Sequence, residues 1–442
     1  MSARLRMRIM AAAGLLLAAS AGAADWDWGG GGETLTTLGL VPDFNFDQRD
    51  RLALWLGAKP VPWLTFSFGG SYAFSYNTAA TPPVRPYLFD VDYLKTELRL
   101  GPRVQAVAGR SAFSDFTGHV MAHTLDGMRF QVALPFMVLN AGIGFSGLML
   151  KPVSTVIMTN TDSAEQTMPE VFFAAPRLIE TVGVVFPQLF ARQDLTISFL
   201  AQQDLRPGAK LIPEGTTEAS PAGLYGGRLD TYYAGVGLGG PIVPALYYDA
   251  FFYFETGTTL SYGDFSQSGS SSWKYQPIVA FLGGLGVRYF FEGRLSSRAE
   301  IRGVFSSGDP DNSTFLEGNT AGYSMMFVPI SQEELSLVFA PRLGNLLLLE
   351  ASYSLKPHES LQTLLKALVF IRPGAGAISE GGLAAAAGAA YLGAEIDVVL
   401  NFRPFSDLGL SLSVGGFLPS PEFTGAAAQP RFKGRIETSV SF

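Results

Sequence analysis

The chain of 442 residues contains no cysteine, which excludes disulfide bonds, a lipid-modified cysteine and thiolate chemistry. Charged residues are scarce at 16%, and histidine occurs only three times. After residue 23 there is no run of about 18 uninterrupted apolar residues, the length that a membrane-spanning helix needs. Yet the chain has 50 glycines, 12% aromatic residues and a mean hydropathy of +0.23, which would be unusual for a soluble domain of this length.

These absences and excesses together indicate one class of fold. Hydrocarbon offers no hydrogen-bonding partner to the backbone, so only helices and closed β-barrels can cross a membrane. Because no segment after residue 23 suits a spanning helix, the sequence predicts an all-β protein. The expected architecture is a transmembrane antiparallel up-and-down β-barrel.

The first residues are typical of a secretory signal. Three arginines at positions 4, 6 and 8 precede an apolar stretch at 9–19, and small residues at 21–23 form a cleavage site. We predict that residues 1–23 are a signal peptide and that the mature chain begins at Ala24. Removal of the signal peptide leaves 28 of the 31 Lys+Arg against 38 Asp+Glu, a formal charge of about −10. We therefore expect no nucleic-acid partner.

Strict alternation of side chains is the main evidence for strands. Between 64 and 76 one face carries Leu64, Phe66, Phe68, Gly70, Tyr72, Phe74 and Tyr76, and the other carries only Thr, Ser, Gly and Ala. This length suits a tilted transmembrane strand with its rim. Similar alternation occurs at 195–199, 298–305, 391–402 and 408–414, whereas 245–254 is aromatic on both faces and fits less well.

The last twelve residues alternate in the same way, but with charge on one face. Arg431, Lys433, Arg435 and Glu437 oppose apolar or small residues that end on Phe442. A lipid-facing Arg or Lys costs about 2–4 kcal/mol at the bilayer midplane, so the charges must face a wet lumen.

Connections of two kinds separate these segments. Short, proline-containing turns at 59–62, 240–244 and 403–407 are expected on the periplasmic side, and longer polar loops are expected outside at 78–86, 151–176, 203–226, 263–274, 306–320 and 373–388. The count gives about 16–18 strands, an even number, but it does not close between Ser306 and Gly388, where 327–361 fits two strands or three.

The predicted domain organisation has three parts: the signal peptide at 1–23, an N-terminal segment at 24–47, and the barrel at 48–442. The N-terminal segment contains Trp26, Trp28, Phe44 and Phe46. The sequence leaves open whether this segment is the first strand or a plug inside the barrel.

Charged residues in the inward phase are the candidate pore lining. They are Arg110, Arg129, Arg298, Glu300, Arg302, Glu395, Asp397, Arg431, Lys433, Arg435 and Glu437. Their mixed signs fit two roles: ion-pair ladders that hold the wall, or a transverse field that orients a solute. The segment Ser111–Leu125 is the candidate for an infolded constriction, with a plain surface loop as the alternative.

The sequence gives little support for catalysis, metal binding or phosphate binding. His119 and His123 have the spacing of metal ligands on a helix, but no HExxH glutamate or cysteine accompanies them, and His358 is isolated. The glycine-rich stretches at 29–32 and 381–393 lack the lysine of a phosphate-binding loop. We therefore predict no enzyme activity, no cofactor and no metal.

Two resemblances add to this interpretation. The ending at 435–442, with Val440 and Phe442, resembles the C-terminal assembly signal of bacterial outer-membrane barrels, which implies recognition by the barrel-assembly machinery. Gly109-Arg110, Leu125-Asp126-Gly127, the run 391–397 and Phe417-Leu418-Pro419 resemble the alginate-export and related porin families, and these patches span under a tenth of the chain. That resemblance implies a barrel and passive transport, but an acidic chain with mixed lumen charges departs from an arginine-lined pore for an anionic polysaccharide.

The function expected from the sequence is a porin-like channel of the bacterial outer membrane, for passive diffusion of small hydrophilic solutes. Two alternatives remain open: a plugged transporter for hydrophobic compounds, similar to fatty-acid transporters, and a structural or adhesive barrel acting through its loops. The expected partners are outer-membrane lipid, the assembly machinery and small solutes, and an apolar outer face could also form the interface of a homo-oligomer.

Overall fold

The computed structural model describes residues 25–41, 43–78, 86–266, 269–293, 295–311, 316, 323–331, 334–380, 390–423 and 425–442. The signal-peptide prediction for 1–23 and most of the expected loop at 78–86 lie outside these residues. Among the described residues, no helix is both long and apolar enough to cross a membrane.

Eighteen strands form one antiparallel sheet. In chain order they are β1 (Asp25–Val41), β2 (Asp43–Val61), β3 (Leu64–Asn77), β4 (Tyr87–Leu100), β5 (Val104–Ser114), β6 (Ala122–Ala133), β7 (Val138–Phe145), β8 (Arg177–Phe190), β9 (Gln193–Asp204), β10 (Asp230–Val243), β11 (Leu246–Gly263), β12 (Ser272–Phe290), β13 (Arg298–Ser306), β14 (Leu346–His358), β15 (Leu361–Ile371), β16 (Tyr391–Phe405), β17 (Leu408–Pro419) and β18 (Arg431–Ser441). The short helices are η1 (Lys151–Val153), α2 (Asn160–Thr167), η2 (Gly208–Lys210) and η3 (Gly425–Ala428).

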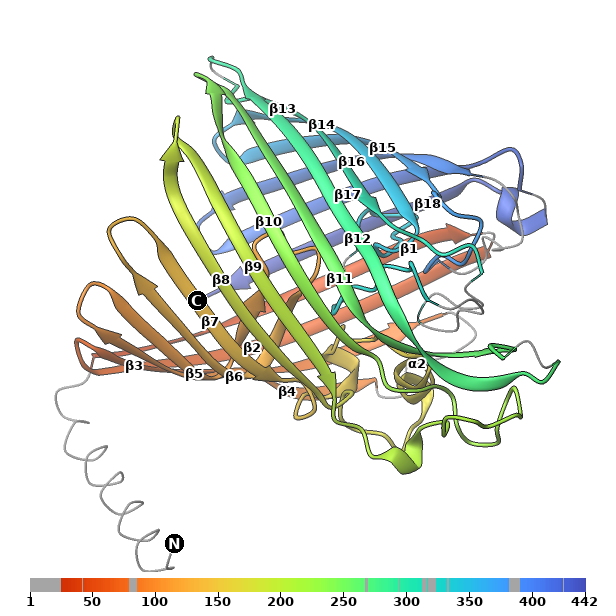
Figure 1. The fold of residues 1–442 in the computed structure, drawn as a ribbon. Helices are drawn as coiled ribbons and strands as arrows, with labels where there is room; N and C mark the ends of the chain where they lie inside the picture. The colour runs from red at the N-terminus through yellow and green to blue at the C-terminus, as the bar shows by residue number, and fades with distance from the viewer. Residues whose placement is uncertain are drawn as a thin grey trace, which may run out of the picture.

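The sheet closes on itself because its first strand pairs with both its second and its last (Figure 1). β1 pairs with β2 along its whole length and with β18 from Gly31↔Ser441 to Leu40↔Phe432. At the seam the backbones of Gly30 and Phe442 exchange two hydrogen bonds of 3.0 Å. The predicted antiparallel barrel is confirmed, and its strand number is 18.

The outer wall follows the predicted alternation. On β18, Phe432, Ile436, Val440 and Phe442 are 46–77% exposed, as side chains that would face lipid. The inward positions of the same strand carry the charges, as the cost of a charge in hydrocarbon requires.

The connections alternate in length as expected, with short turns at one end of the barrel and long segments at the other (Figure 1). Two-residue turns follow β2, β8, β10, β14 and β16. Long connections at 146–176, 205–229, 307–345 and 372–390 lie at the opposite end, together with α2. Which end faces the cell exterior stays a prediction from the sequence.

The N-terminal segment is part of the wall. Residues 25–41 form β1 and are hydrogen-bonded on both sides, and the boundary drawn before residue 48 falls inside β2. The barrel domain therefore begins at Asp25, and the plug alternative for this segment is wrong. At both ends of the strand, even positions carry exposed apolar side chains, namely Trp26, Trp28, Leu38 and Leu40.

The interior is not uniformly polar. Inward-facing apolar residues of the wall, such as Ile179, Leu200 and Phe370, are at most 3% exposed and belong to one hydrophobic cluster. Residues of long connections, among them Met158 and Phe327, complete this cluster. Part of the lumen is thus filled by folded-in chain, which sequence alternation did not predict.

The same infolding explains why the strand count did not close after Ser306. Among the described residues of the ambiguous stretch, the strands are β14 and β15, and those of 327–345 form no strand. Its apolar residues Phe327, Ile330 and Phe339 are fully buried in the interior cluster.

Candidate functional site in the barrel lumen

The tip of the β5–β6 hairpin leaves the barrel wall. β4 pairs with β5 only as far as Leu94↔Arg110, and β6 pairs with β7 only as far as Asp126↔Phe145. Beyond these points Ser111–Leu125 pairs only within its own hairpin. This is the segment for which the sequence offered a constriction or a surface loop, and the structure places it inside the barrel.

Two glycines allow the hairpin to bend. Gly109 and Gly127 face each other across β5 and β6, and Gly109 has φ +111°. A Cβ on Gly109 would lie 2.1 Å from the Leu94 carbonyl oxygen, and one on Gly127 would lie 2.0 Å from that of Ile143. Only glycine permits such close backbone approaches and such a φ angle.

Arg110 occupies the place that the hairpin leaves. Its guanidinium contacts Asp126 at 2.9 Å and Asp90 at 3.5 Å, and donates to the carbonyl oxygens of Val91 at 2.8 Å and Leu148 at 3.1 Å. The side chain is only 10% exposed. Arg110 thus links β4, β6 and the β7–β8 connection, a structural role beside its predicted place in the pore lining.

The hairpin tip reaches the opposite part of the wall. The Tyr253 hydroxyl on β11 donates to Asp115 Oδ2 at 3.0 Å, and the Phe116 ring stacks on Tyr253 at 5.2 Å between centroids. The Val120 carbonyl accepts a hydrogen bond of 2.9 Å from Ile330 N, in the β13–β14 connection. The tip is therefore held from two sides.

Asp115 also shapes the tip itself. Its Oδ1 accepts from the backbone amides of Val120 and Met121 at 3.1 and 2.8 Å, and its Oδ2 accepts from Thr117 N at 2.8 Å. A carboxylate that satisfies several backbone N–H groups fixes a loop that has few ladder hydrogen bonds.

Glycines in the facing wall make room for the aromatic side chains. A Cβ on Gly235 would lie 2.2 Å from the Tyr253 ring, and one on Gly237 would lie 2.5 Å from the Phe116 ring. β10 therefore contributes bare backbone against which these rings lie.

The β13–β14 connection is anchored by carboxylates of the wall. Glu395 accepts from Val338 N and Phe339 N, both at 2.8 Å, and Glu255 accepts from Val328 N at 3.0 Å. Glu395 is 1% exposed, so this predicted pore-lining residue holds an infolded segment. Asp397 lies on the same inward face and is 3% exposed.

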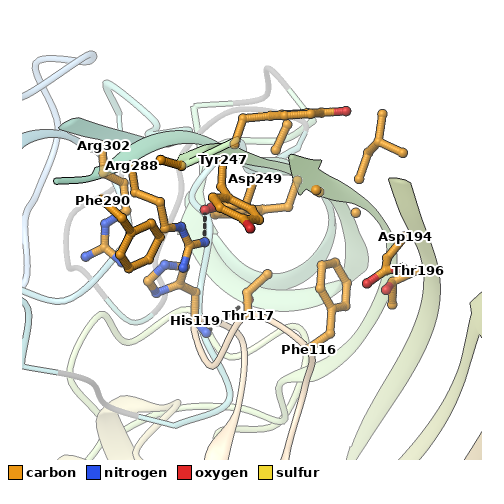
Figure 2. Close-up of a pocket in the computed structure, with 18 residues that line it drawn as sticks. Phe116, Thr117, His119, Asp194, Thr196, Tyr247, Asp249, Arg288, Phe290 and Arg302 are labelled. Atoms are coloured by element: carbon orange, nitrogen blue, oxygen red, sulfur yellow. Dashed lines mark hydrogen bonds and ion pairs between the residues drawn. The ribbon is translucent and has the colours of Figure 1, made fainter. Parts of the chain in front are cut away.

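Two cavities remain beside the hairpin tip. One of about 780 Å³ lies between Phe116, His119 and the wall of β10–β12, and includes Asp249, Arg288 and Arg302 in its lining (Figure 2). The other, of about 350 Å³, lies against β5–β9 and includes Arg129. Phe116 and Thr196 line both cavities. These spaces are the candidate solute path.

Four of the other predicted lumen arginines have a carboxylate partner within 4 Å. Arg298 contacts Glu300 at 3.4 Å, Arg302 contacts Glu350 at 3.3 Å, Arg431 contacts Glu380 at 3.2 Å, and Arg435 contacts Glu334 at 3.6 Å. Arg302 and Glu350 face each other on β13 and β14, as in an ion-pair ladder of the wall, whereas Arg431 and Arg435 contact carboxylates of the long connections.

The remaining predicted residues differ in surroundings. Arg129 on β6 lies with its guanidinium carbon 5.4 Å from the Phe113 ring centroid. Lys433 and Glu437 share the inward face of β18 with Arg431 and Arg435. Whether these side chains contact a permeating solute stays a prediction.

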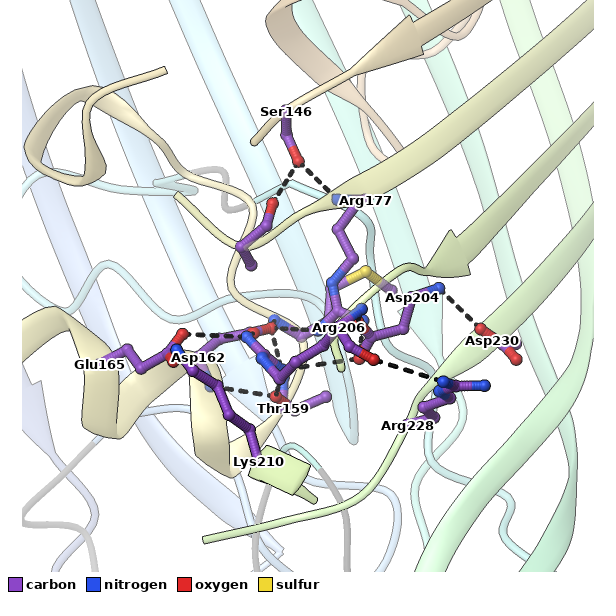
Figure 3. Close-up of polar contacts among 12 residues, drawn as sticks. Ser146, Thr159, Asp162, Glu165, Arg177, Asp204, Arg206, Lys210, Arg228 and Asp230 are labelled. Atoms are coloured by element: carbon purple, nitrogen blue, oxygen red, sulfur yellow. Dashed lines mark hydrogen bonds and ion pairs between the residues drawn. The ribbon is translucent and has the colours of Figure 1, made fainter. Parts of the chain in front are cut away.

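A buried ion-pair cluster joins α2 to the ends of β8 and β9, at the end of the barrel with the long connections (Figure 3). Arg177 at the start of β8 contacts Asp162 of α2 at 2.7 Å and also Asp204 at the end of β9. Arg206 contacts Asp162, Glu165 at 3.1 Å and Asp204 at 3.5 Å. Both arginines are at most 1% exposed, so α2 is tied to the rim by charges shielded from water.

Burial and the neighbouring charges act in opposite directions on the pKa values of Asp162 and Arg206. Burial by itself would raise the pKa of Asp162, but Arg177 and Arg206 outweigh it and hold that pKa at about 2. Burial disfavours a charged Arg206, yet Asp162 and Asp204 raise its pKa. Asp162 and Arg206 therefore stay ionised at physiological pH.

Sequence analysis did not find this cluster, because its members come from three separate segments, at 162–165, 177 and 204–206. One local signal was present: Thr159 and Asp162 form a capping box at the start of α2. The polar composition of 151–176 predicts only a long extracellular loop. Likewise Asp115 and Tyr253 lie 138 residues apart, and nothing local in the sequence joins them.

The histidines do not assemble a metal site among the described residues, where no group of three or more His, Asp and Glu side chains could hold an ion. His119 lies in the hairpin tip, with its ring 5.4 Å from that of Phe251. His123 lies on β6 with Nδ1 3.3 Å from Thr155 Oγ1, and His358 contacts Ser360.

Comparison with known proteins gives structural neighbours only. No family model and no curated protein sequence matches the chain. Among solved structures, the outer-membrane protein OpdK of Pseudomonas aeruginosa is similar with a TM-score of 0.57 and 11% identity, covering 95% of this chain and 98% of that one. OccK5 (OpdH) of the same organism has a TM-score of 0.56, 9% identity and the same coverages. The outer-membrane protein OprD has a TM-score of 0.52 and 8% identity over 94% of this chain and 93% of that one.

At these identities the likeness concerns the fold. The 18-stranded antiparallel barrel matches the fold of these Pseudomonas aeruginosa proteins. The resemblance to alginate-export proteins that the sequence suggested is not shown by these comparisons.

Proposed function

We propose that this protein is a porin-like channel of the bacterial outer membrane, through which small hydrophilic solutes diffuse past a narrow constriction. The observation that carries the proposal is the β5–β6 hairpin tip, which bends into a closed barrel and touches β11 while leaving cavities on both sides of Phe116. A closed barrel with an internal obstruction is a device for limiting passage by size.

The filled interior supports a selective channel over a wide general pore. The interior cluster joins the hairpin tip, the β7–β8 connection and the β13–β14 connection through Val120, Met158 and Phe327. We therefore expect a low conductance and a strong dependence on the three infolded segments.

The alternatives from the sequence have less support. A transporter plugged by its N-terminal segment is contradicted, because that segment is β1. An adhesive role has no specific observation in its favour. Three further predictions accompany the proposal: location in the outer membrane, assembly through the strand ending at Phe442, and formation of a homo-oligomer. No catalytic role is proposed.

Conductance measurement tests the proposal directly. Purified protein reconstituted in planar bilayers should give stepwise ion currents, and their reversal potential in a salt gradient reads the sign of selectivity. Replacing residues 115–121 by a short Gly-Ser linker should raise the conductance several-fold, since the obstruction is removed.

A change in a different loop tests whether the effect on conductance is specific to the constriction. Shortening the exposed stretch 215–219 in the β9–β10 connection removes a similar length of loop without touching the hairpin tip. Its conductance should equal that of the parent. Absence of stepwise currents from both parent and 115–121 variant, in protein shown to be folded, would exclude the channel.

A further inference from the structure

The larger cavity exposes aromatic rings to the lumen. Phe116 and Tyr247 are each 38% exposed and Phe290 is 41% exposed, and all three line the same space of about 780 Å³. In a water-filled barrel the side chains that face the lumen are expected to be polar. Three partly exposed rings in one cavity therefore need a reason other than wall stability.

The rings come from different parts of the fold and face one space. Phe116 belongs to the hairpin tip, whereas Tyr247 and Phe290 belong to the inner face of β11 and β12, with centroids 5.7 Å apart in a T-shaped arrangement. Figure 2 shows Phe116 on one side of the cavity and Phe290 on the other. Gly237 and Gly239 leave the intervening wall of β10 without side chains.

The charges of the cavity are balanced. Its lining contains two arginines and two aspartates, and Arg288 forms an ion pair with Asp249 inside the cavity. Arg302 is paired with Glu350 at 3.3 Å. A site with paired charges and no excess of either sign has no strong attraction for an anion or for a cation.

Paired charges still offer hydrogen bonds. Arg288 and Asp249 are about one-third exposed, so the guanidinium can donate and the carboxylate can accept. Thr117 and Thr196 add hydroxyl groups that do both. The site therefore combines flat apolar faces with donors and acceptors at fixed places, as small-molecule sites of this size do.

We propose that this cavity binds a neutral polyhydroxylated solute of sugar size, with an apolar face of its ring on Phe116, Tyr247 or Phe290 and its hydroxyl groups on Arg288 and Asp249. The inference rests on the proposed channel function and names its substrate class. A carboxylate would meet Asp194 and Asp249, and a cation would meet Arg288 and Arg302.

The test is blockade of ion current by a neutral sugar. Maltose added to the reconstituted channel should interrupt the current in a concentration-dependent way, whereas benzoate and choline at equal concentration should interrupt it much less. Phe290→Leu and Tyr247→Leu should each weaken the maltose block about 3- to 10-fold, the usual contribution of one aromatic contact.

Outward positions supply matched controls. Tyr289→Leu and Phe252→Leu remove a ring from the opposite face of the same strands, at positions that do not line the cavity, and should leave the maltose block unchanged. Block that persists in the Phe290 and Tyr247 variants, or benzoate blocking at lower concentration than maltose, would overturn the sugar site.

A second readout separates this inference from the proposed function. Maltose binding to the detergent-solubilised protein can be measured by titration calorimetry without any current. Binding that Phe290→Leu weakens, in a protein that never conducts, would contradict the channel and keep the site. Conduction without maltose binding or block would keep the channel and overturn the site.

Discussion

The Tyr253 hydroxyl donates a hydrogen bond of 3.0 Å to Asp115 Oδ2, which joins the wall strand β11 to the tip of the β5–β6 hairpin. Both side chains are buried, at 0% and 7% exposure. This contact spans the interior of the barrel and determines where the obstruction lies.

Removing the hydroxyl should loosen the tip. Tyr253→Phe keeps the stacking on Phe116 but loses a hydrogen bond to a charged group, which contributes about 1.5–3 kcal/mol. We expect noisier single-channel currents with a higher mean conductance. Tyr289→Phe, on the outer face of the neighbouring strand β12, is the control. Identical current noise in parent and Tyr253→Phe channels would show that the contact does not hold the tip.

The glycine pair at the bend gives a second prediction. Gly109→Ala places a Cβ 2.1 Å from a backbone oxygen at a positive φ, so the hairpin must shift or the barrel must lose pairing there. We expect lower thermal stability and altered conductance. Gly434→Ala on β18, where a Cβ would meet nothing within 4 Å, should change neither property. Equal melting temperatures for the two variants would contradict the strain at the bend.

The ion-pair cluster at the mouth should be sensitive to loss of one charge. Asp162→Asn leaves Arg177 and Arg206 buried with fewer carboxylates, and breaking a buried pair in this way costs about 3–5 kcal/mol. We expect the β7–β8 connection to open locally while the barrel stays folded, measured as faster proteolysis within 146–176. Glu214→Gln, on an exposed loop, is the control. Unchanged proteolysis would mean that the cluster does not hold α2.

The contact between Glu380 and Arg431 predicts a pH dependence. Burial raises the pKa of Glu380 to about 7 from its ordinary value near 4.5, and Arg431 offsets only part of this shift. Because the pKa is higher in the folded protein, the docking of residues 372–380 is most stable below pH 4.5 and weakens as the pH rises through about 7.

Hydrogen exchange of the amides at 372–380, corrected for intrinsic rates, should therefore show faster opening from about pH 5 to pH 8. Glu380→Gln should remove this dependence. Protection that increases over the same interval would reverse the sign and contradict the argument.

The last residue yields a prediction about assembly. Phe442 is 77% exposed on the outer face, and its backbone closes the barrel against Gly30. If the C-terminal strand is an assembly signal, Phe442→Ala should reduce the folded fraction in the outer membrane, measured by the heat-dependent shift in gel mobility. Phe432→Ala, on the same face of the same strand, should assemble normally. Equal folded fractions would contradict the special role of the terminal aromatic residue.

The sequence did not predict the apolar part of the lumen, and the reason can be identified. The segment 245–254 was aromatic on both faces because Phe251 and Tyr253 turn inward beneath the hairpin tip, where they meet His119 and Phe116. The mostly apolar stretches 327–330 and 335–339 were compatible with strands because burial in the lumen and burial in a wall select the same residue types. Local periodicity cannot distinguish these two apolar surroundings.

The sequence by itself determined the wall: which residues face outward, how short and long connections alternate, and that an even number of strands closes. It could do so because alternate side chains meet hydrocarbon or the interior, a choice made residue by residue. Only the tertiary structure decided the constriction, the buried charge cluster and the aromatic cavity. Those features depend on contacts such as Asp115 with Tyr253, between residues far apart in the chain, and no local pattern specifies such a contact.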